Sequence, residues 1–184
     1  MCYDLIRWLV KSRRLPLPFL LKRKILLGYI KKYKLKTFME TGTCYGDMLA
    51  GLKNYVEQAI SIEIDETLYQ NAQNRFHNCD NVKIIFGDSA KILPSLLDNL
   101  DAPTLFYLDA HYSGPGTGMG DVEAPLLNEL KTLLNTDIKN HIILIDDARH
   151  LGSNNYPTLE EIKNLFKQTA LVVRNDHDIV RIST

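Results

Sequence analysis

From Thr37 to the end of the chain, short apolar runs alternate with longer segments of helical period, and this alternation restricts the fold more than any other feature. Strands are expected at 37–41, 59–64, 82–86, 103–109, 141–146, 169–174 and 178–183, and helices at 47–56, 66–77, 89–99, 122–134 and 158–167. Strands that alternate with helices form a parallel sheet with helices on both faces. We therefore predict an α/β fold, a Rossmann-like three-layer sandwich around a seven-stranded, mostly parallel sheet.

The last two expected strands depart from this pattern, because only Asn175, Asp176 and His177 lie between them. A parallel crossover needs about a dozen residues or more. The final pair should therefore be an antiparallel hairpin. A chain of 184 residues that is 45% hydrophobic suits one globular domain with a sizeable core.

The first strand leads into a loop that is suited to a ligand. The apolar run 37–39 ends in Glu40, and Gly42 and Gly46 follow before the helix begins near Asp47. Glycine can adopt positive φ and lets the backbone approach a ligand closely. Ligands of open α/β sheets bind outside the carboxyl ends of the strands. Taken alone, the loop is either such a site or an ordinary turn between a strand and a helix.

Acidic residues also follow the next strands. Glu63 ends the second strand about 20 residues after the glycines, where a carboxylate can accept hydrogen bonds from ribose hydroxyls. Asp88 and Ser89 follow the third strand and suit an adenine edge, although Asp88 is equally suited to cap the next helix. Asp109 follows the fourth strand, and the pair 146–147 follows the fifth.

The order and spacing of these strand ends resemble the class I S-adenosylmethionine-dependent methyltransferases, over residues 37–184. The resemblance implies that S-adenosylmethionine contacts the strand ends, through Glu40, Thr41, Gly42, Thr43, Gly46, Glu63, Ile64, Asp88, Ser89 and Asp109. One departure is visible, because the family's usual Gly-x-Gly-x-Gly is here interrupted by Cys44 in the middle position.

Other nucleotide ligands fit the first loop less well. A dinucleotide fingerprint needs a second glycine where the backbone meets the pyrophosphate, and position 44 is Cys. A P-loop is excluded because Gly-Lys-Ser/Thr follows neither glycine-rich segment. Glu40 would repel a phosphate, whereas it would attract the cationic sulfonium and ammonium groups of S-adenosylmethionine.

Three carboxylates, Asp109, Asp146 and Asp147, should meet at one rim of the sheet, where they would repel one another without a cation. Mg²⁺ prefers such oxygen ligands. The pattern resembles the metal-dependent O-methyltransferases, which include macrolide-sugar and catechol enzymes, and implies that these three acids bind Mg²⁺. The alternative is that Asp109 only positions the substrate while Asp146 or Asp147 caps a turn.

His111 follows Asp109 by two residues and is the first candidate for the base that removes the acceptor proton, with His150 as the second. A structural role for His111 is the alternative. The glycine-rich segment 112–121 is either a simple connection or a lid over the acceptor. The polar segment 147–157 suits a polyhydroxylated acceptor.

Residues 1–36 form a basic arm ahead of the predicted methyltransferase domain at 37–184. Eleven of the 22 Lys and Arg residues lie between Arg7 and Lys36, against the single acid Asp4. No apolar run reaches the roughly 18 residues that a membrane span needs, and no signal peptide is evident. The arm is either a pair of amphipathic helices that cap the sheet or the active site, or an interfacial element that contacts an anionic membrane or a lipid-linked acceptor.

Nucleic acid is a less attractive partner, because the rest of the chain is acidic and no aromatic-basic platform is present. Three scattered cysteines form neither a disulfide framework nor a zinc pattern, which indicates the cytoplasm. The sequence leaves the oligomeric state open.

These patterns together predict methyl transfer from S-adenosylmethionine to a hydroxyl of a sugar or glycan, assisted by Mg²⁺, as in polysaccharide biosynthesis. Two alternatives stay open. One is a metal-independent methyltransferase that acts on a small molecule, and the other is a module that binds S-adenosylmethionine without catalysis.

Overall fold

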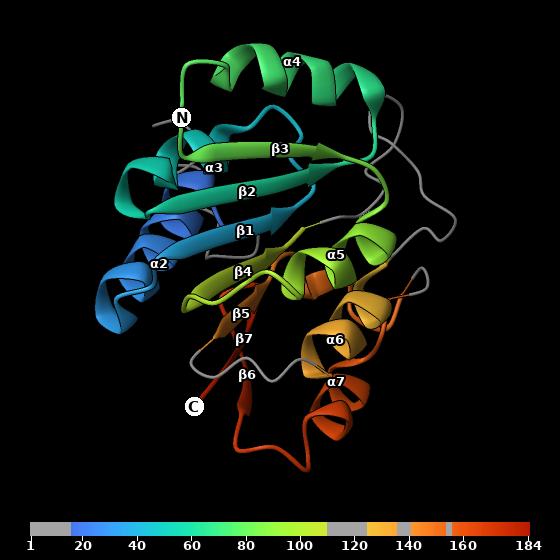
Figure 1. Cartoon of the computed structure of the whole chain (residues 1–184). Coiled ribbons are helices and arrows are strands. Elements are labelled where there is room, and N and C mark those ends of the chain that lie inside the picture. Colours follow the sequence, from blue (N-terminus) through green and yellow to red (C-terminus); the bar gives the residue numbers. More distant parts are fainter. Residues whose placement is uncertain (1–15, 110–124, 136–140, 154–155) are drawn as a thin grey trace.

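A computed structural model describes residues 16–109, 125–135, 141–153 and 156–184, and its centre is a seven-stranded sheet in the order β3-β2-β1-β4-β5-β7-β6 (Figure 1). The strands are β1 (Thr37–Thr41), β2 (Gln58–Glu63), β3 (Val82–Phe86), β4 (Thr104–Leu108), β5 (Ile142–Ile145), β6 (Val172–Asp176) and β7 (Ile179–Ser183). Strands β1 to β5 pair in parallel, whereas β7 runs antiparallel to both β5 and β6. The predicted fold class is confirmed, including the antiparallel last strand.

The hairpin between β6 and β7 has a simple local cause. Its two loop residues, His177 and Asp178, have φ of 53° and 66°. Two consecutive residues with positive φ form the tight turn whose twist matches an antiparallel pair. This turn reverses the chain and inserts β7 between β5 and β6.

Helices cover both faces of the sheet, which makes three layers (Figure 1). Helices α2 (Phe19–Tyr33), α3 (Asp47–Leu52) and α4 (Glu66–Phe76) pack on one face, and α5 (Ser89–Leu97), α6 (Leu126–Leu134) and α7 (Leu159–Leu165) pack on the other. Alternate strand residues supply the two cores. Phe38 and Leu105 point to the face of α2, whereas Met39 and Phe106 point to the face of α6.

Some element boundaries differ from those expected from sequence. The helix predicted at 47–56 ends at Leu52 and continues as the 3₁₀ helix η1 (Lys53–Tyr55), where the side-chain amide of Asn81 donates to the carbonyl oxygens of Lys53 and Val56. Strand β6 begins three residues later than predicted, because Thr169 Oγ1 accepts from the backbone N–H of Leu171 and holds that segment in a turn.

The described part of the predicted arm packs on the sheet. Leu26 and Ile30 of α2 are buried in the same core as β1 and β4, and Leu17 and Leu35 flank them. This packing fits the interpretation of the arm as a cap on the sheet, while membrane or lipid contact stays a prediction. In the described part of the chain, no helix is both long enough and apolar enough to cross a membrane.

Candidate functional site

The loop between β1 and α3, residues 42–46, has three left-handed positions in five residues. Gly42, Cys44 and Gly46 have φ of 87°, 50° and 73°. The backbone N–H of Gly46 donates to the carbonyl oxygen of Thr43 at 2.7 Å, which closes the turn. Cys44 therefore adopts the conformation that glycine takes more readily. Cys44 stands where the motif that the sequence resembles has glycine, yet the loop keeps the conformation of a glycine-rich turn.

Gly46 is required for a second reason. A Cβ added at this position would lie 2.7 Å from Cε2 of Phe76, a buried residue of α4. The loop therefore lies directly against α4. Arg75 fastens it there, because its guanidinium donates to the carbonyl oxygen of Tyr45 and, at 2.8 Å, to Oδ1 of Asp47.

Glu40 is buried at the end of β1, with 2% of its surface exposed. Its Oε1 accepts from Ser61 Oγ at 2.8 Å, and Ser61 Oγ lies 2.6 Å from Thr43 Oγ1. Burial raises the pKa of Glu40 to about 8, helped by the charges of Asp109 and Glu63, while the Ser61 hydrogen bond opposes the rise. At neutral pH the carboxyl is mostly protonated until a cation approaches it.

The strand register places Glu40 in a polar row. Ser61 of β2 and Tyr107 of β4 are its direct neighbours across the sheet, and their side chains point to the face of α2. The hydroxyl of Tyr107 donates to Oδ2 of Asp146. Burial, together with the charges of Asp109 and Asp146, raises the pKa of Tyr107 well above its ordinary value, so this phenol remains a donor.

Glu63 holds the loop to the end of β2. Its Oε2 accepts from the backbone N–H of Cys44 at 2.8 Å, and its Oε1 accepts from those of Ile64 and Asp65 at 3.0 and 2.9 Å. A carboxylate has about four lone-pair sites. These three bonds leave about one acceptor site for a ligand, so the prediction that Glu63 binds a ribose remains a prediction.

Asp88 caps α5, as one of its two interpretations expected, because its Oδ1 accepts from the backbone N–H of Ala90 at 3.0 Å. Ser89 is buried beside Glu129 of α6. Burial raises the pKa of Glu129 to about 7, and the neighbouring hydroxyls of Ser89 and Thr41 oppose the rise. Adenine contact by Asp88 and Ser89 remains a prediction.

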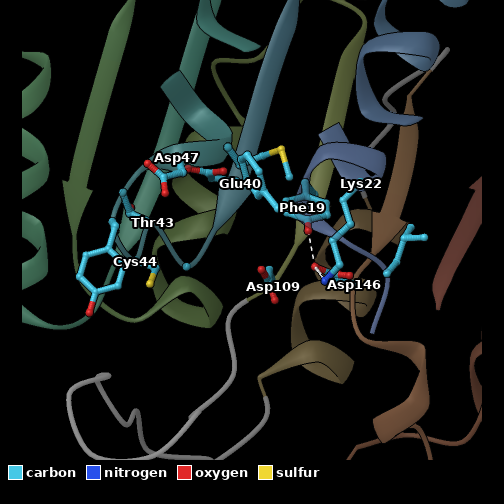
Figure 2. Close-up of a pocket in the computed structure, with 13 residues that line it drawn as sticks. Phe19, Lys22, Glu40, Thr43, Cys44, Asp47, Asp109 and Asp146 are labelled. Atoms are coloured by element: carbon cyan, nitrogen blue, oxygen red, sulfur yellow. Dashed lines mark hydrogen bonds and ion pairs between the residues drawn. The ribbon is translucent and has the colours of Figure 1, made fainter. Parts of the chain in front are cut away.

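A pocket of about 240 Å³ opens between the loop, β4 and the start of α2. Figure 2 shows Glu40 and Thr43 on one side of it, Lys22 and Asp146 on the other, and Asp109 between them. It is lined by Leu17, Phe19, Lys22, Glu40, Gly42, Thr43, Cys44, Tyr45, Asp47, Met48, Tyr107, Asp109 and Asp146. The predicted residues Glu63, Ile64, Asp88 and Ser89 lie outside this pocket, at the ends of the neighbouring strands β2 and β3, and Thr41, Gly46 and Asp147 are not among its lining residues either.

The acid pair after β5 contacts a lysine of the basic arm. Lys22 Nζ donates to Asp146 Oδ2 at 2.6 Å and to Asp147 Oδ1 at 2.9 Å. Asp147 has a left-handed backbone with φ of 52°, and its N–H donates to Asp146 Oδ1 at 2.8 Å. Arg149 also donates to Asp147 Oδ1, at 2.7 Å. Two cations therefore neutralise the pair.

These contacts separate the protonation of the two acids. Burial and the charge of Asp109 raise the pKa of Asp146 to about 7, against the effect of Lys22. Burial alone would raise the pKa of Asp147, but Lys22 and Arg149 outweigh it and the pKa is lowered. Burial would likewise lower the pKa of Lys22, but the two carboxylates outweigh it and the pKa is raised.

The predicted Mg²⁺ site does not fit this arrangement. Among the described residues, no group of three His, Cys, Asp or Glu side chains is placed to hold a metal ion. The ammonium of Lys22 lies at hydrogen-bond distance from both predicted ligands of the acid pair. Since Mg²⁺ needs oxygen ligands at about 2.0–2.1 Å, the ion and the ammonium cannot occupy this position together.

The first predicted base, His111, lies outside the described residues, as does the whole segment 112–121. His150 is half-buried after β5, with its ring 6.0 Å from that of Tyr156. The residues of the site that were not predicted from the sequence include Lys22, Tyr107 and Glu129. Lys22 and Glu129 each carried a signal, since each is a charged residue on the apolar face of its helix.

Comparisons with solved structures found similar folds at low sequence identity. The methyltransferase PaMTH1 of Podospora anserina, solved with SAH, is 17% identical with a TM-score of 0.65, over 97% of this chain and 86% of that one. The O-methyltransferase TomG of Streptomyces achromogenes, solved with SAM, is 14% identical with a TM-score of 0.62, over 89% and 79%. The N-methyltransferase NodS of Bradyrhizobium japonicum WM9 is 12% identical with a TM-score of 0.56, over 88% and 92%.

Neither a family model nor a curated protein matches the sequence. The likeness to solved structures establishes the fold: the chain has the class I S-adenosylmethionine-dependent methyltransferase fold, which occurs in both O- and N-methyltransferases.

Proposed function

We propose that the protein transfers the methyl group of S-adenosylmethionine to a hydroxyl oxygen of a small polyhydroxylated acceptor, such as a sugar or a glycan intermediate. The observation that carries this proposal is Glu40, a buried carboxyl that faces the pocket beside the left-handed loop 42–46. A buried carboxyl that is not paired with a cation of the protein can pair with a cationic ligand instead. PaMTH1 and TomG, which have the same fold, were solved with SAH and SAM respectively.

When bound, S-adenosylmethionine would supply a methyl group on a positively charged sulfur. Glu40 would attract the ammonium and sulfonium charges, and Thr43 would border the same end of the ligand. Glu63 and Asp88, at the ends of β2 and β3, would face the ribose and the adenine. The residues predicted from sequence would in this way form one wall of the cofactor site.

Asp109, which lies between the two sides of the pocket, and Tyr107, which also lines it, would contact the acceptor near the methyl group. The acceptor oxygen would form the new bond to the methyl carbon, the carbon-sulfur electron pair would stay on sulfur, and the hydroxyl proton would go to a base. His111 remains the proposed base. Asp109 would position the acceptor, which was the alternative to its predicted role as a metal ligand.

A hydroxyl acceptor suits the polar lining of the pocket. Tyr107, Asp109, Asp146 and Lys22 offer both donors and acceptors of hydrogen bonds, which suit hydroxyl groups. TomG is an O-methyltransferase with this fold. The same lining favours a polyhydroxylated acceptor over an apolar one.

Calorimetry with S-adenosylmethionine and SAH, followed by methyl-transfer assays on sugars, catechols and amines, tests the proposal. Micromolar binding and transfer to a hydroxyl are expected. Absence of binding by the folded protein would refute it. Binding without transfer to any acceptor would favour the alternative of a non-catalytic module, and transfer to amines alone would refute the oxygen acceptor.

His111 has its own test within this assay. Replacing His111 with Ala should reduce turnover by about 100-fold or more, as loss of a general base does, with the affinity for S-adenosylmethionine retained. Unchanged turnover would remove His111 from the mechanism.

A further inference from the structure

Helix α2 directs one lysine into the pocket and the others to solvent. Lys22, Leu26 and Ile30 are spaced by four residues, so they share one face of the helix, and Leu26 and Ile30 are buried in the core beneath it. The side chain of Lys22 is 13% exposed, whereas Lys24 and Lys31 are exposed. A lysine that continues an apolar face needs a partner, and here the partner is the acid pair after β5.

The local sequence does not explain this lysine. Lys22 lies in the first turns of α2, near the end where the helix dipole disfavours a cation, and no acid lies in the first turn. Nor does its pairing with two nearly buried carboxylates indicate a stabilising role, since the desolvation of such charges can exceed their attraction. A residue that breaks local rules without a clear gain in stability is a candidate for function.

The ammonium also has the donors that such a function needs. A lysine carries three N–H donors. Asp146 Oδ2 and Asp147 Oδ1 accept two of them, at 2.6 and 2.9 Å. Because Lys22 lines the same pocket as Glu40 and Asp109, the third N–H is available to an acceptor oxygen there.

We propose that Lys22 is the resident cation of the acceptor site, so that its ammonium binds the acceptor oxygen and methyl transfer needs no divalent metal. This inference rests on the proposed methyl transfer. A cation beside the attacking hydroxyl lowers the cost of the negative charge that develops as the proton leaves. Asp146 and Asp147 then serve to position Lys22, and Tyr107 orients Asp146. The basic segment delivers this charge to the site.

The first test measures metal binding and needs no knowledge of the acceptor. Mn²⁺ is titrated against the full chain and monitored by electron paramagnetic resonance. The unmodified protein and Lys22→Arg, which keeps the charge, should bind no Mn²⁺ in this pocket up to millimolar concentration. Lys22→Met should gain a site that Asp146→Asn removes in the double variant. Lys24→Met, on the exposed side of the same helix, is the matched control and should not gain one.

Two outcomes of the titration would overturn the proposal. One is Mn²⁺ binding by the unmodified protein that Asp146→Asn abolishes, because the metal and the ammonium would then not exclude each other. The other is a folded Lys22→Met that binds no Mn²⁺, because Lys22 would then not hold the place of a cation. If Lys22→Met fails to fold, the titration of the unmodified protein still shows whether the metal and the ammonium exclude each other.

The second test measures activity and affinity together. Turnover should persist in excess EDTA. It should fall about 100-fold in Lys22→Met, with the affinity for S-adenosylmethionine retained, and recover in part with Mg²⁺. Activity that EDTA abolishes and Mg²⁺ restores in the unmodified protein would overturn the proposal. Failure to bind S-adenosylmethionine at all would instead refute the proposed function, while the Mn²⁺ titration would still report on Lys22.

Discussion

Replacement of Glu40 with Gln should stabilise the free protein and weaken its binding of S-adenosylmethionine. The pKa of Glu40 is about 8 in the folded protein, against 4.5 for an unperturbed glutamate. Between these values the unfolded chain has released a proton that the folded protein still holds. Stability therefore falls as the pH rises through this window. Gln cannot ionise, and its amide oxygen can still accept from Ser61.

The size of the effect follows from these two pKa values. At 1.36 kcal/mol per pKa unit, keeping Glu40 protonated costs about 4 kcal/mol at pH 7.5 and about 1 kcal/mol at pH 5. The buried amide group of Gln can lose about 1–3 kcal/mol if it lacks an acceptor, but that cost does not vary with pH. The gain in stability from Glu40→Gln should therefore be about 3 kcal/mol larger at pH 7.5 than at pH 5.

Urea denaturation followed by circular dichroism at both pH values measures this difference. Glu57→Gln is the matched control, because the side chain of Glu57 is 70% exposed and the change should have little effect at either pH. Equal effects of Glu40→Gln at pH 5 and pH 7.5 would refute the argument that burial holds Glu40 protonated.

Although Glu40→Gln should stabilise the protein, it should weaken the binding of S-adenosylmethionine. If a cationic ligand needs ionised Glu40, the affinity for S-adenosylmethionine should rise by up to tenfold per pH unit between pH 6 and 7, below the pKa of about 8. Glu40→Gln should lose about tenfold in affinity at pH 7.5 and should lose this pH dependence. A variant that binds as tightly as the unmodified protein would mean that Glu40 does not face the cofactor.

Three further predictions concern stability. Gly46→Ala should lower the free energy of unfolding by about 2–4 kcal/mol, because of the left-handed backbone and the contact with Phe76. Gly28→Ala is the control within α2: its added Cβ would have no atom within 4 Å, so the change should be neutral or stabilising. Equal losses of stability for the two variants in urea denaturation would contradict this prediction. Burial lowers the pKa of His141 to about 4, so the unfolded chain takes up a proton before the folded protein does, and stability falls as the pH drops from 6.5 towards 4. His141→Asn should reduce this loss of stability. If the variant and the unmodified protein lose stability equally over this pH range, His141 is not its cause. Thr158→Ala removes the capping box of α7 and should lower the free energy of unfolding by about 1 kcal/mol. A variant with the same thermal midpoint as the unmodified protein would disprove this prediction.

The sheet could be predicted because its signals are local. Strands such as β4 and β5 are apolar throughout, and the short connection before β7 excludes a parallel crossover. The loop at Gly42 and Gly46 was predicted for the same reason, since a glycine pattern lies within a few residues. The left-handed conformation of Cys44 was not, because that residue type gives no sign of positive φ.

Side chains that meet across the sheet gave weaker signals. Glu129 could have been noticed as an acid on the apolar stripe of Leu126, Leu130 and Leu133. Its neighbours Thr41 and Ser89 come from other elements, and only the register brings them together. Tyr107 had no signal of its own, because a tyrosine in a buried strand looks like any other core aromatic residue.

The acid pair 146–147 illustrates what such patterns can determine. Carboxylates that meet at one rim repel one another, so the need for a cation could be argued from the sequence alone. Electrostatics does not specify which cation, however, and both Mg²⁺ and an ammonium satisfy it. The choice depends on Lys22, which is 124 residues away from Asp146 in the sequence and reaches it only because Leu26 and Ile30 seat α2 on the sheet. A charge on the buried face of a terminal helix is therefore the feature to compare with unpaired acids at strand ends, before a metal is assigned to them.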